Sequence, residues 1–342
     1  MSLAAHVAGL RRARGRRRQR LGLMLLALLL AAAALTLSLG RSFTPPLDVL
    51  RVLAGEEVPV ASFTVGELRL PRAALSILAG MAFGLGGAAF QTLLRNPLAS
   101  PDVIGISSGA GAAAVFAIVL LGWSGPAVSL LAVAGGLGVA LAIWALAWRG
   151  GVAGARLILV GIGVSAMLQS VTAWCLSQAP SWTLQEAMRW LTGSVNGATL
   201  EQSRPLLAAL LALGAVLLAQ ARALETMRLG DDAAAALGVR VERTRLVVAL
   251  AAVGLVSVAT AVAGPIAFVA FLSGPIAARV VGARGSLLAP AALVGALLTL
   301  GADYAGQFLL PGRYPVGVVT GALGAPYLLY LIVRAGRSGA LS

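Results

Sequence analysis

Few residues in this chain could do chemistry, and their types exclude several kinds of active site. A metal centre of histidine and cysteine ligands needs several such residues, but His6 and Cys175 are the only ones here. The one cysteine has no partner for an intrachain disulfide, and we expect it to be buried in an apolar segment. Ser107 and Ser108 lack a histidine partner, so helix capping explains them better than nucleophilic catalysis. We therefore expect no catalytic residue, no metal site and no cofactor bound by this chain.

The absence of lysine decides whether the chain can bind a nucleotide through a P-loop. All 26 basic residues are arginines, whereas the motif G-x-x-x-x-G-K-[ST] needs its lysine to reach the β- and γ-phosphates. If ATP drives this protein, another polypeptide must bind and hydrolyse it. The net charge of +14 does not indicate nucleic-acid binding, because the arginines lie in short segments between apolar stretches. Membrane topology and anionic lipid explain them better.

Long apolar stretches recur along the whole chain, which is 59% hydrophobic and only 11% charged. The first, residues 21–38, carries no charge and is too long for the core of a cleaved signal peptide. A helix of about 20 such residues crosses the roughly 30 Å hydrocarbon core of a membrane. The sequence therefore predicts an all-α, polytopic membrane protein with one membrane domain over residues 21–334. Its ten predicted transmembrane helices lie at residues 21–40, 71–93, 103–121, 126–148, 156–177, 205–221, 245–263, 265–281, 287–309 and 315–334.

The arginines also predict which way the protein faces. Seven of them crowd into residues 11–20, directly before the first predicted helix. If residues 1–20 form a cytoplasmic tail, the segments on that side carry 19 arginines and five acids, whereas the outer segments carry seven of each. The positive-inside rule then places both termini, including the tail at 335–342, in the cytoplasm. We expect the stretch around His6 to be disordered.

The cytoplasmic segment 222–244 has the features of a contact surface for a partner. Asp231 and Asp232 follow Gly230, and carboxylates at such a position favour a helix N-terminus. The alanine-rich stretch after them forms helix readily, and Gly238 is typical of a helix end. The sequence predicts a short helix that binds a cytoplasmic protein, and the alternative is an ordinary solvated loop.

Glycine and proline predict where helices pack closely and where one is broken. Gly264-Pro265 and Gly274-Pro275 lie close together, and proline removes a helix hydrogen-bond donor, so we expect a broken or shortened span there. Irregular backbone at membrane depth is tolerated where it is buried or lines a water-filled cavity, which points to a transport pathway. Close helix packing is expected at three G-x-x-x-G pairs, namely Gly80 and Gly84, Gly105 and Gly109, and Gly317 and Gly321.

Asp303 is the only acid inside a predicted span. Burying an acid inside a membrane costs free energy, so such a residue is taken to have a function. Asp303 either serves proton coupling or pairs with Arg313 near the outer face. A single acid without a histidine or basic relay gives little support to proton coupling. An ion-coupled secondary transporter, the rival class, would also need internal symmetry and more intramembrane polar residues.

Several motifs in a fixed order give the chain a resemblance to one family. The motifs are Arg69-Leu-Pro-Arg72, Gln91-Thr-Leu-Leu-Arg-Asn-Pro97 with its continuation to Gly109, Leu229-Gly-Asp231, Ala236-Leu-Gly238-Val, Gly264-Pro-Ile-Ala-Phe-Val269, Pro315-Val-Gly-Val-Val-Thr320 and Gly324-Ala-Pro326. From about residue 20 to 334 the chain resembles the FecCD-type permeases, which are the membrane subunits of bacterial ABC importers for ferric siderophores, haem and cobalamin.

This resemblance implies a multi-pass protein of the bacterial plasma membrane that is a pore subunit and not an enzyme. It implies a second permease subunit (a second copy or a paralogue), two cytoplasmic ATPase subunits that use ATP and Mg, and an extracytoplasmic substrate-binding protein. Many members have Pro-His where this chain has Pro275-Ile, so no role of that histidine transfers. The resemblance favours ferric siderophores as substrate, with haem or cobalamin as the alternative.

The resemblance also implies functional residues in three places. The segment expected to couple to the ATPase holds Gly230, Asp231, Asp232, Ala236, Leu237 and Gly238. The binding protein is expected to dock at the outer end of the second span, on Arg69 and Arg72, and by its position on Arg313. The fifth and tenth spans would line the translocation pathway with Ser165, Gln169, Thr172, Val319 and Thr320.

Overall fold

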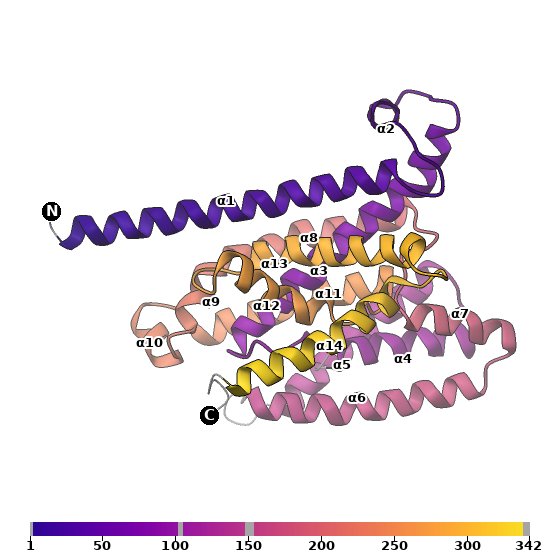
Figure 1. Cartoon of the computed structure of the whole chain (residues 1–342). Coiled ribbons are helices and arrows are strands. Elements are labelled where there is room, and N and C mark those ends of the chain that lie inside the picture. Colours follow the sequence, from indigo (N-terminus) through magenta and orange to yellow (C-terminus); the bar gives the residue numbers. More distant parts are fainter. Residues whose placement is uncertain (1–2, 102–104, 148–153, 338–342) are drawn as a thin grey trace.

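The computed structural model describes residues 3–101, 105–147 and 154–337, and throughout these ranges the regular structure is helical (Figure 1). A helix coincides with each of the ten predicted spans. Seven of these helices are long and apolar enough to cross a membrane, and three have shorter apolar stretches, so the count of ten crossings stays a prediction. The ten helices are α1 (Leu3–Ser38), α3 (Leu70–Leu93), α4 (Ile106–Val119), α5 (Pro126–Ala147), α6 (Gly154–Ser177), α8 (Leu200–Ala219), α11 (Val241–Ala263), α12 (Val269–Val281), α13 (Leu288–Tyr304) and α14 (Val316–Arg337).

Shorter helices lie at the two ends of the molecule. One end carries α2 (Pro46–Leu53) and α7 (Ser181–Leu191), and the other carries α9 (Ala221–Met227), α10 (Asp231–Ala236), the start of α1 and the end of α14 (Figure 1). Segments that the arginine count assigns to opposite sides of the membrane therefore lie at opposite ends. We call these the outer and the cytoplasmic end, an assignment that rests on the positive-inside prediction.

Two local expectations are wrong. α1 runs as one helix from Leu3 to Ser38, so the stretch around His6 is helical rather than disordered, in keeping with the good helix propensity of arginine and alanine. Ser107 and Ser108 lie inside the first turn of α4, after its N-cap residue Gly105, so neither caps that helix. Residues 102–104 of the quoted motif, most of the predicted cytoplasmic segment 149–155 and the end of the predicted tail 335–342 lie outside the described residues.

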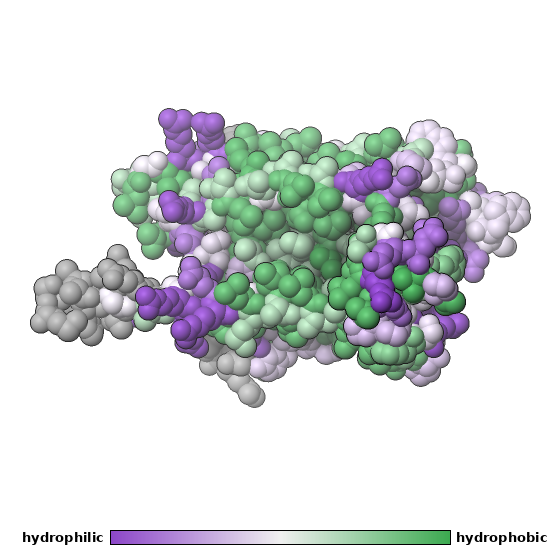
Figure 2. All heavy atoms as spheres, turned by 90° about the horizontal axis from the view of Figure 1, so that it is seen from above, coloured by the Kyte–Doolittle hydropathy of each residue, from purple (hydrophilic) through white to green (hydrophobic). Residues whose placement is uncertain are grey.

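Apolar side chains cover the middle of the molecule on the face drawn in Figure 2, and polar ones gather towards its ends. Large apolar side chains are also widely exposed on other helices, with exposed fractions of 72% for Leu130 on α5 and 70% for Leu159 and Met167 on α6. Apolar surface of this extent suits hydrocarbon or another subunit rather than water. The distribution agrees with a multi-pass membrane protein.

Glycines allow α3 to lie at the centre of the helix packing, where it contacts α13, α11, α12 and α8. Gly80 and Gly84 lie directly against α13, where an added Cβ would overlap its backbone. Gly109 of α4 lies against α5 in the same way. The predicted close packing is thus confirmed at two of the three glycine pairs. In the third pair, Gly317 is closely packed but Gly321 has open space around it.

The predicted break between α11 and α12 is confirmed. Residues 264–268 are not helical, and Gly264 and Phe268 have positive φ angles of 72° and 63°. α12 has 13 residues, with Pro275 among them, and at about 1.5 Å per residue it is shorter than the hydrocarbon core. The N–H of Ser194, in the segment after α7, donates to the oxygen of Ala263 at 2.8 Å and so ties the break to the outer end.

Candidate functional site

A cleft of about 650 Å³ lies at the outer end of the molecule. Its walls come from the segments that follow α1, α7 and α13 and from those that precede α3 and α14. They include two π-helical segments, η1 (Ser62–Arg69) and η3 (Ala305–Leu309). π-helical turns are rare in proteins, and those that occur are often found at functional sites. The cleft carries an excess of positive charge, because its charged lining residues are Arg41, Arg69, Arg72, Arg189, Arg313, Glu67 and Asp303.

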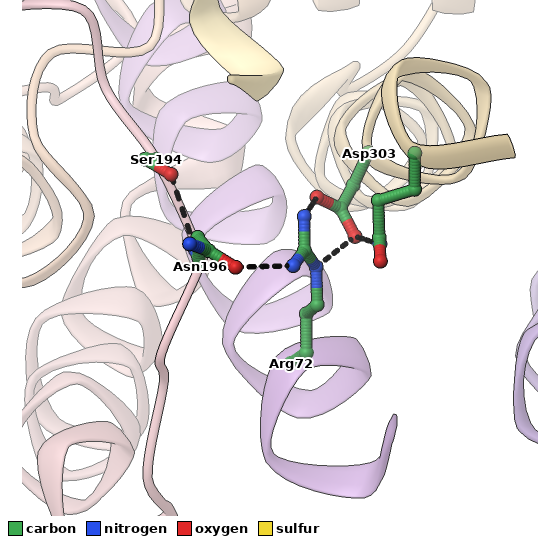
Figure 3. A network of polar contacts seen from close by, with 5 residues as sticks. Arg72, Ser194, Asn196 and Asp303 are labelled. Atoms are coloured by element: carbon green, nitrogen blue, oxygen red, sulfur yellow. Dashed lines mark hydrogen bonds and ion pairs between the residues drawn. The ribbon is translucent and has the colours of Figure 1, made fainter. Parts of the chain in front are cut away.

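Within this cleft Arg72 and Asp303 form a bidentate ion pair. Nε of Arg72 donates to one carboxylate oxygen of Asp303 at 2.8 Å, and Nη2 donates to the other at 2.7 Å. Nη1 of Arg72 donates to Oδ1 of Asn196 at 2.8 Å (Figure 3). Nε2 of Gln307, one helical turn after Asp303, donates to the carboxylate at 2.8 Å. Asp303 is only 4% exposed, so this network supplies the counter-charge and hydrogen bonds that a buried carboxylate needs.

The expectation that Asp303 pairs with Arg313 is wrong, because Arg72 occupies both of its oxygens. The reason is the packing of α3 against α13, which places Arg72 and Asp303 opposite each other although 231 residues separate them. Arg313 lies beyond η3 in an exposed connection that also lines the cleft. Asp303 therefore has a fixed ion-pair partner and no proton relay among the described residues.

Arg69 closes the end of α1. Its guanidinium donates to the backbone oxygens of Leu37 at 2.8 Å, Ser38 at 3.0 Å and Ser42 at 2.6 Å. Carbonyl groups in the last turn of a helix lack intrahelical donors and carry partial negative charge, so an arginine stabilises them in two ways. Gly40 makes room for this contact, because an added Cβ there would lie 2.8 Å from Nη2 of Arg69.

At the cytoplasmic end, the predicted short helix is confirmed as α10. Gly230 precedes it with a φ of 111°, and Gly238 follows it with a φ of 85°. The N–H groups of Gly238 and Val239 donate to the oxygens of Ala235 and Ala234 at 2.9 and 3.0 Å, which is the hydrogen-bond pattern of a Schellman helix end. Glycine adopts such backbone angles far more readily than most residues, so the two glycines determine where α10 begins and ends.

Asp231 fastens α10 to the membrane domain. Its carboxylate pairs with Arg95, in the connection after α3, and with Nη2 of Arg245, at the start of α11, at 2.9 Å. Burial raises the pKa of Asp231, but the hydrogen bond and charge of Arg245, together with those of Arg95, lower the pKa more, so it lies below its ordinary value. Asp231 thus links α10 to the start of α11 and to the connection that follows α3.

The other predicted coupling residues lie on the free side of this segment. Asp232, Ala236 and Leu237 are exposed, and Leu237 reaches an exposed fraction of 66%. Ala234 is fully buried and packs into the main hydrophobic core. The segment thus has one face against the body and one face that presents a leucine and a carboxylate to solvent.

The predicted pathway residues lie on two helices and do not line the cleft. On α6, Gln169 is exposed, Thr172 donates through its hydroxyl to the oxygen of Leu168, and the hydroxyl of Ser165 is buried near Gly105. On α14, two residues are buried inside this chain: Val319 and Thr320. The structure therefore does not bring the two groups into one cavity, and their role stays a prediction.

Sequence reasoning missed four residues that complete these networks. They are Arg95, Asn196, Arg245 and Gln307. The two arginines belong to the cytoplasmic excess of positive charge, and each lies near the acidic segment once the chain is folded. The sequence therefore showed that arginines were available on this side, but it did not show which of them pair with Asp231.

Comparison with known proteins places the chain among transport proteins. The model of the FecCD transport family matches residues 26–334. The ferric enterobactin transport system permease protein FepG of Escherichia coli (strain K12) is 43% identical over 293 residues, which cover 84% of this chain and 88% of that protein. The achromobactin transport system permease protein CbrC of Dickeya dadantii (strain 3937) is 41% identical over 303 residues, which cover 87% of this chain and 86% of that protein.

A solved structure shows the same fold. A metal-chelate type ABC transporter in an inward-facing conformation superimposes with a TM-score of 0.80 at 24% identity, covering 92% of this chain and 99% of that chain. The arrangement of helices described above is therefore that of an ABC transporter permease.

Proposed function

The chain belongs to the FecCD transport family, and from that premise we propose that it is the permease subunit of an ATP-driven importer of ferric siderophores. The observation that carries the substrate is the match to FepG and CbrC over more than four fifths of the chain. An importer of the same class for haem or cobalamin is the alternative. An ion-coupled secondary transporter has only Asp303 in its favour, and that carboxylate is paired with Arg72.

The energy for transport would come from two cytoplasmic ATPase subunits that use ATP and Mg. This chain contains no lysine and so has no P-loop of its own, and in this proposal it binds no cofactor. The exposed side of α10, with Asp232, Ala236 and Leu237, would dock on the ATPase. Support comes from the pairing of Asp231 with Arg95 and Arg245, which would pass the movement of α10 to two membrane helices.

The pore would form between this chain and a second permease subunit, either a second copy or a paralogue. α6 is the least buried of the long apolar helices, with 11% of its apolar window buried inside this chain, so it has a broad face available for lipid or for a partner. Gln169 and its neighbours on that helix would then line the pathway together with residues of α14. Binding and hydrolysis of ATP would rock the two halves about a central cavity by shifting the equilibrium between inward-open and outward-open states.

The extracytoplasmic substrate-binding protein would dock at the cleft on the outer end. Support comes from the five arginines and two acids that line it, because such a surface attracts carboxylates. The predicted docking residues Arg69, Arg72 and Arg313 all lie there.

Uptake of iron-55 tests the proposal. A strain without this chain would be compared with the wild type, using iron-55 loaded on a hydroxamate and on a catecholate siderophore. Loss of uptake of at least one chelate, restored by the intact chain only when the cognate ATPase is also present, would support it. Uptake that persists without the ATPase would favour a secondary transporter, and loss of haem or cobalamin uptake alone would favour the alternative substrates.

A further inference from the structure

The short helix α2 exposes a stripe of leucines at the outer end of the molecule. Leu47 and Leu50, three residues apart, have exposed fractions of 60% and 63%, and Leu53 continues the stripe by another three residues. Phe43, just before the helix, is exposed as well. Large apolar side chains that gather on a surface in this way mark a contact with a membrane or with another protein.

The other two sides of α2 already have their environments. Val49 is buried and Val52 is half-buried, and both belong to a hydrophobic cluster that Val65 of η1 shares. Arg51 pairs with Asp48, with 3.5 Å between Nη1 and Oδ1. Because each residue turns the helix by about 100°, these positions divide α2 into three sides. One side faces the protein, one is polar, and the leucine stripe is the third.

α2 lies beside the bundle of long helices. In Figure 1 it lies past the outer end of α1, on the side of α1 that faces away from the other helices. It is seen nearly end-on, whereas the long helices run across the picture, so its axis runs crosswise to them. A helix that lies in the plane of a membrane surface has this orientation relative to helices that cross it. α1 leads into this segment and exposes Leu30 and Leu35, so an apolar surface suited to lipid continues towards the stripe.

We propose that α2 is an anchor in the outer interface of the membrane, with Leu47 and Leu50 among the acyl chains and Asp48 and Arg51 on the side of the water. An interfacial helix of this kind buries its apolar face about 5–10 Å into the boundary between headgroups and acyl chains. Because α2 packs on η1, which lines the outer cleft, the anchor would also hold that wall of the cleft at a fixed depth. The anchor requires only that the protein lies in a membrane, so it goes beyond the proposed function.

Lipid suits the stripe better than a protein partner does. None of residues 43–63, all of which the structure describes, lines the cleft where the binding protein would dock. Arg51 is held between Asp48 and Glu56, with 3.9 Å between its Nε and the carboxylate of Glu56, so its charge is already matched within the segment. Apolar burial needs no charged headgroup and is not directional, so a membrane of zwitterionic lipid is sufficient for the anchor.

Nitroxide spin labels test the anchor in the complete transporter, reconstituted in nanodiscs of phosphatidylcholine. Leu47→Cys and Leu50→Cys each place a label on the stripe, in separate variants, and Arg51→Cys places the matched control label on the polar side of the same helix. Cys175 is fully buried and is left in place. Collisions with oxygen, which concentrates in hydrocarbon, and with a water-soluble nickel chelate distinguish a label in lipid from a label in water. Thermal unfolding verifies that each labelled variant is folded.

We expect the ratio of oxygen to nickel collisions to be at least about fivefold higher for the two stripe labels than for the control label. The ratio should not change with salt, because screening acts on charges and not on apolar burial. Equal ratios on the two sides of α2 would overturn the anchor, because the stripe would then face water. Stripe labels shielded from both reagents would overturn it as well, since a protein surface would then cover α2. Shielding that begins only when the binding protein is added would assign the stripe to that partner instead of lipid.

Discussion

A hydrogen bond from Gln91 to Phe271 replaces a backbone hydrogen bond that is missing from a helix. The side-chain amide of Gln91, on α3, donates to the backbone oxygen of Phe271, on α12, at 2.9 Å. In an uninterrupted helix the N–H four residues later would donate to that oxygen, but residue 275 is proline and has no N–H. The absence of a side chain at Gly274 leaves room for the amide. A buried polar residue of α3 thus satisfies the acceptor that Pro275 leaves without a donor.

Replacing Gln91 by methionine should destabilise the protein, because the oxygen of Phe271 would be left buried without a donor. A group of this kind costs about 1–3 kcal/mol, so we expect a lower midpoint of thermal unfolding in detergent. Thr92→Val is the control, because the Thr92 hydroxyl bonds at 2.8 Å to an oxygen of its own helix. If Gln91→Met unfolds like the wild type, the hydrogen bond contributes nothing to stability.

Elements that depend on local chemistry could be predicted from the sequence. Apolar stretches predicted a helix in each of the ten segments, because that signal is contained in the segment itself. Gly230 and Gly238 predicted the limits of α10, and Gly264-Pro265 predicted the break before α12, because positive φ and a missing N–H are properties of the residue itself.

Pairings between distant residues could not be predicted in the same way. Asp303 required a cation, but several arginines of the outer end were possible partners, and only the packing of α3 on α13 selects Arg72. The hydrogen bonds of Arg69 to the end of α1 were likewise not predicted, and its role in docking stays a prediction. Gln91, which donates a hydrogen bond to α12, lies 180 residues before its acceptor Phe271. In each case the sequence showed a residue able to form the contact, but it did not show which partner that residue would contact.

Gly84→Ala should destabilise the contact between α3 and α13. The added Cβ would overlap the backbone oxygen of Ala291, and backbone cannot give way as a flexible side chain can. Overpacking of this kind costs about 1–3 kcal/mol, which thermal unfolding would detect. Gly301→Ala, on α13 itself, is the control because a Cβ there meets no atom within 4 Å. Equal unfolding midpoints for the two variants would contradict the close packing of Gly84 against α13.

Gly238→Val should uncouple ATP hydrolysis from uptake. The φ of 85° at this position strains a β-branched residue by about 1–3 kcal/mol, so the end of α10 would be remodelled. Gly238→Asn is the matched control, because asparagine tolerates left-handed backbone. In proteoliposomes with the ATPase and binding protein, we expect the valine variant to hydrolyse ATP with little uptake and the asparagine variant to retain coupling. Normal coupling in Gly238→Val would remove α10 from the transmission path.

The attachment of α10 should withstand mild acid and fail only in strong acid. Arg245 and Arg95 hold the pKa of Asp231 below its ordinary value of about 3.9 against the opposing effect of burial. Because the folded pKa is the lower one, the pairing stabilises α10 above the unfolded pKa and is lost as pH falls through the folded pKa. The side chain of Asp231 is 46% exposed, so the contribution is no more than about 1 kcal/mol.

A spin label on Leu237→Cys would report this attachment, since Cys175 is fully buried and Leu237 is exposed. We expect the mobility of the label in detergent to stay constant from pH 7 to pH 5 and to rise only at more acidic pH. With Asp231→Asn added, the label should be mobile across the whole range, because a neutral amide forms no ion pair with Arg95 or Arg245. A rise in mobility between pH 7 and pH 5, or an Asp231→Asn variant as immobile as its parent, would show that other contacts hold α10 in place.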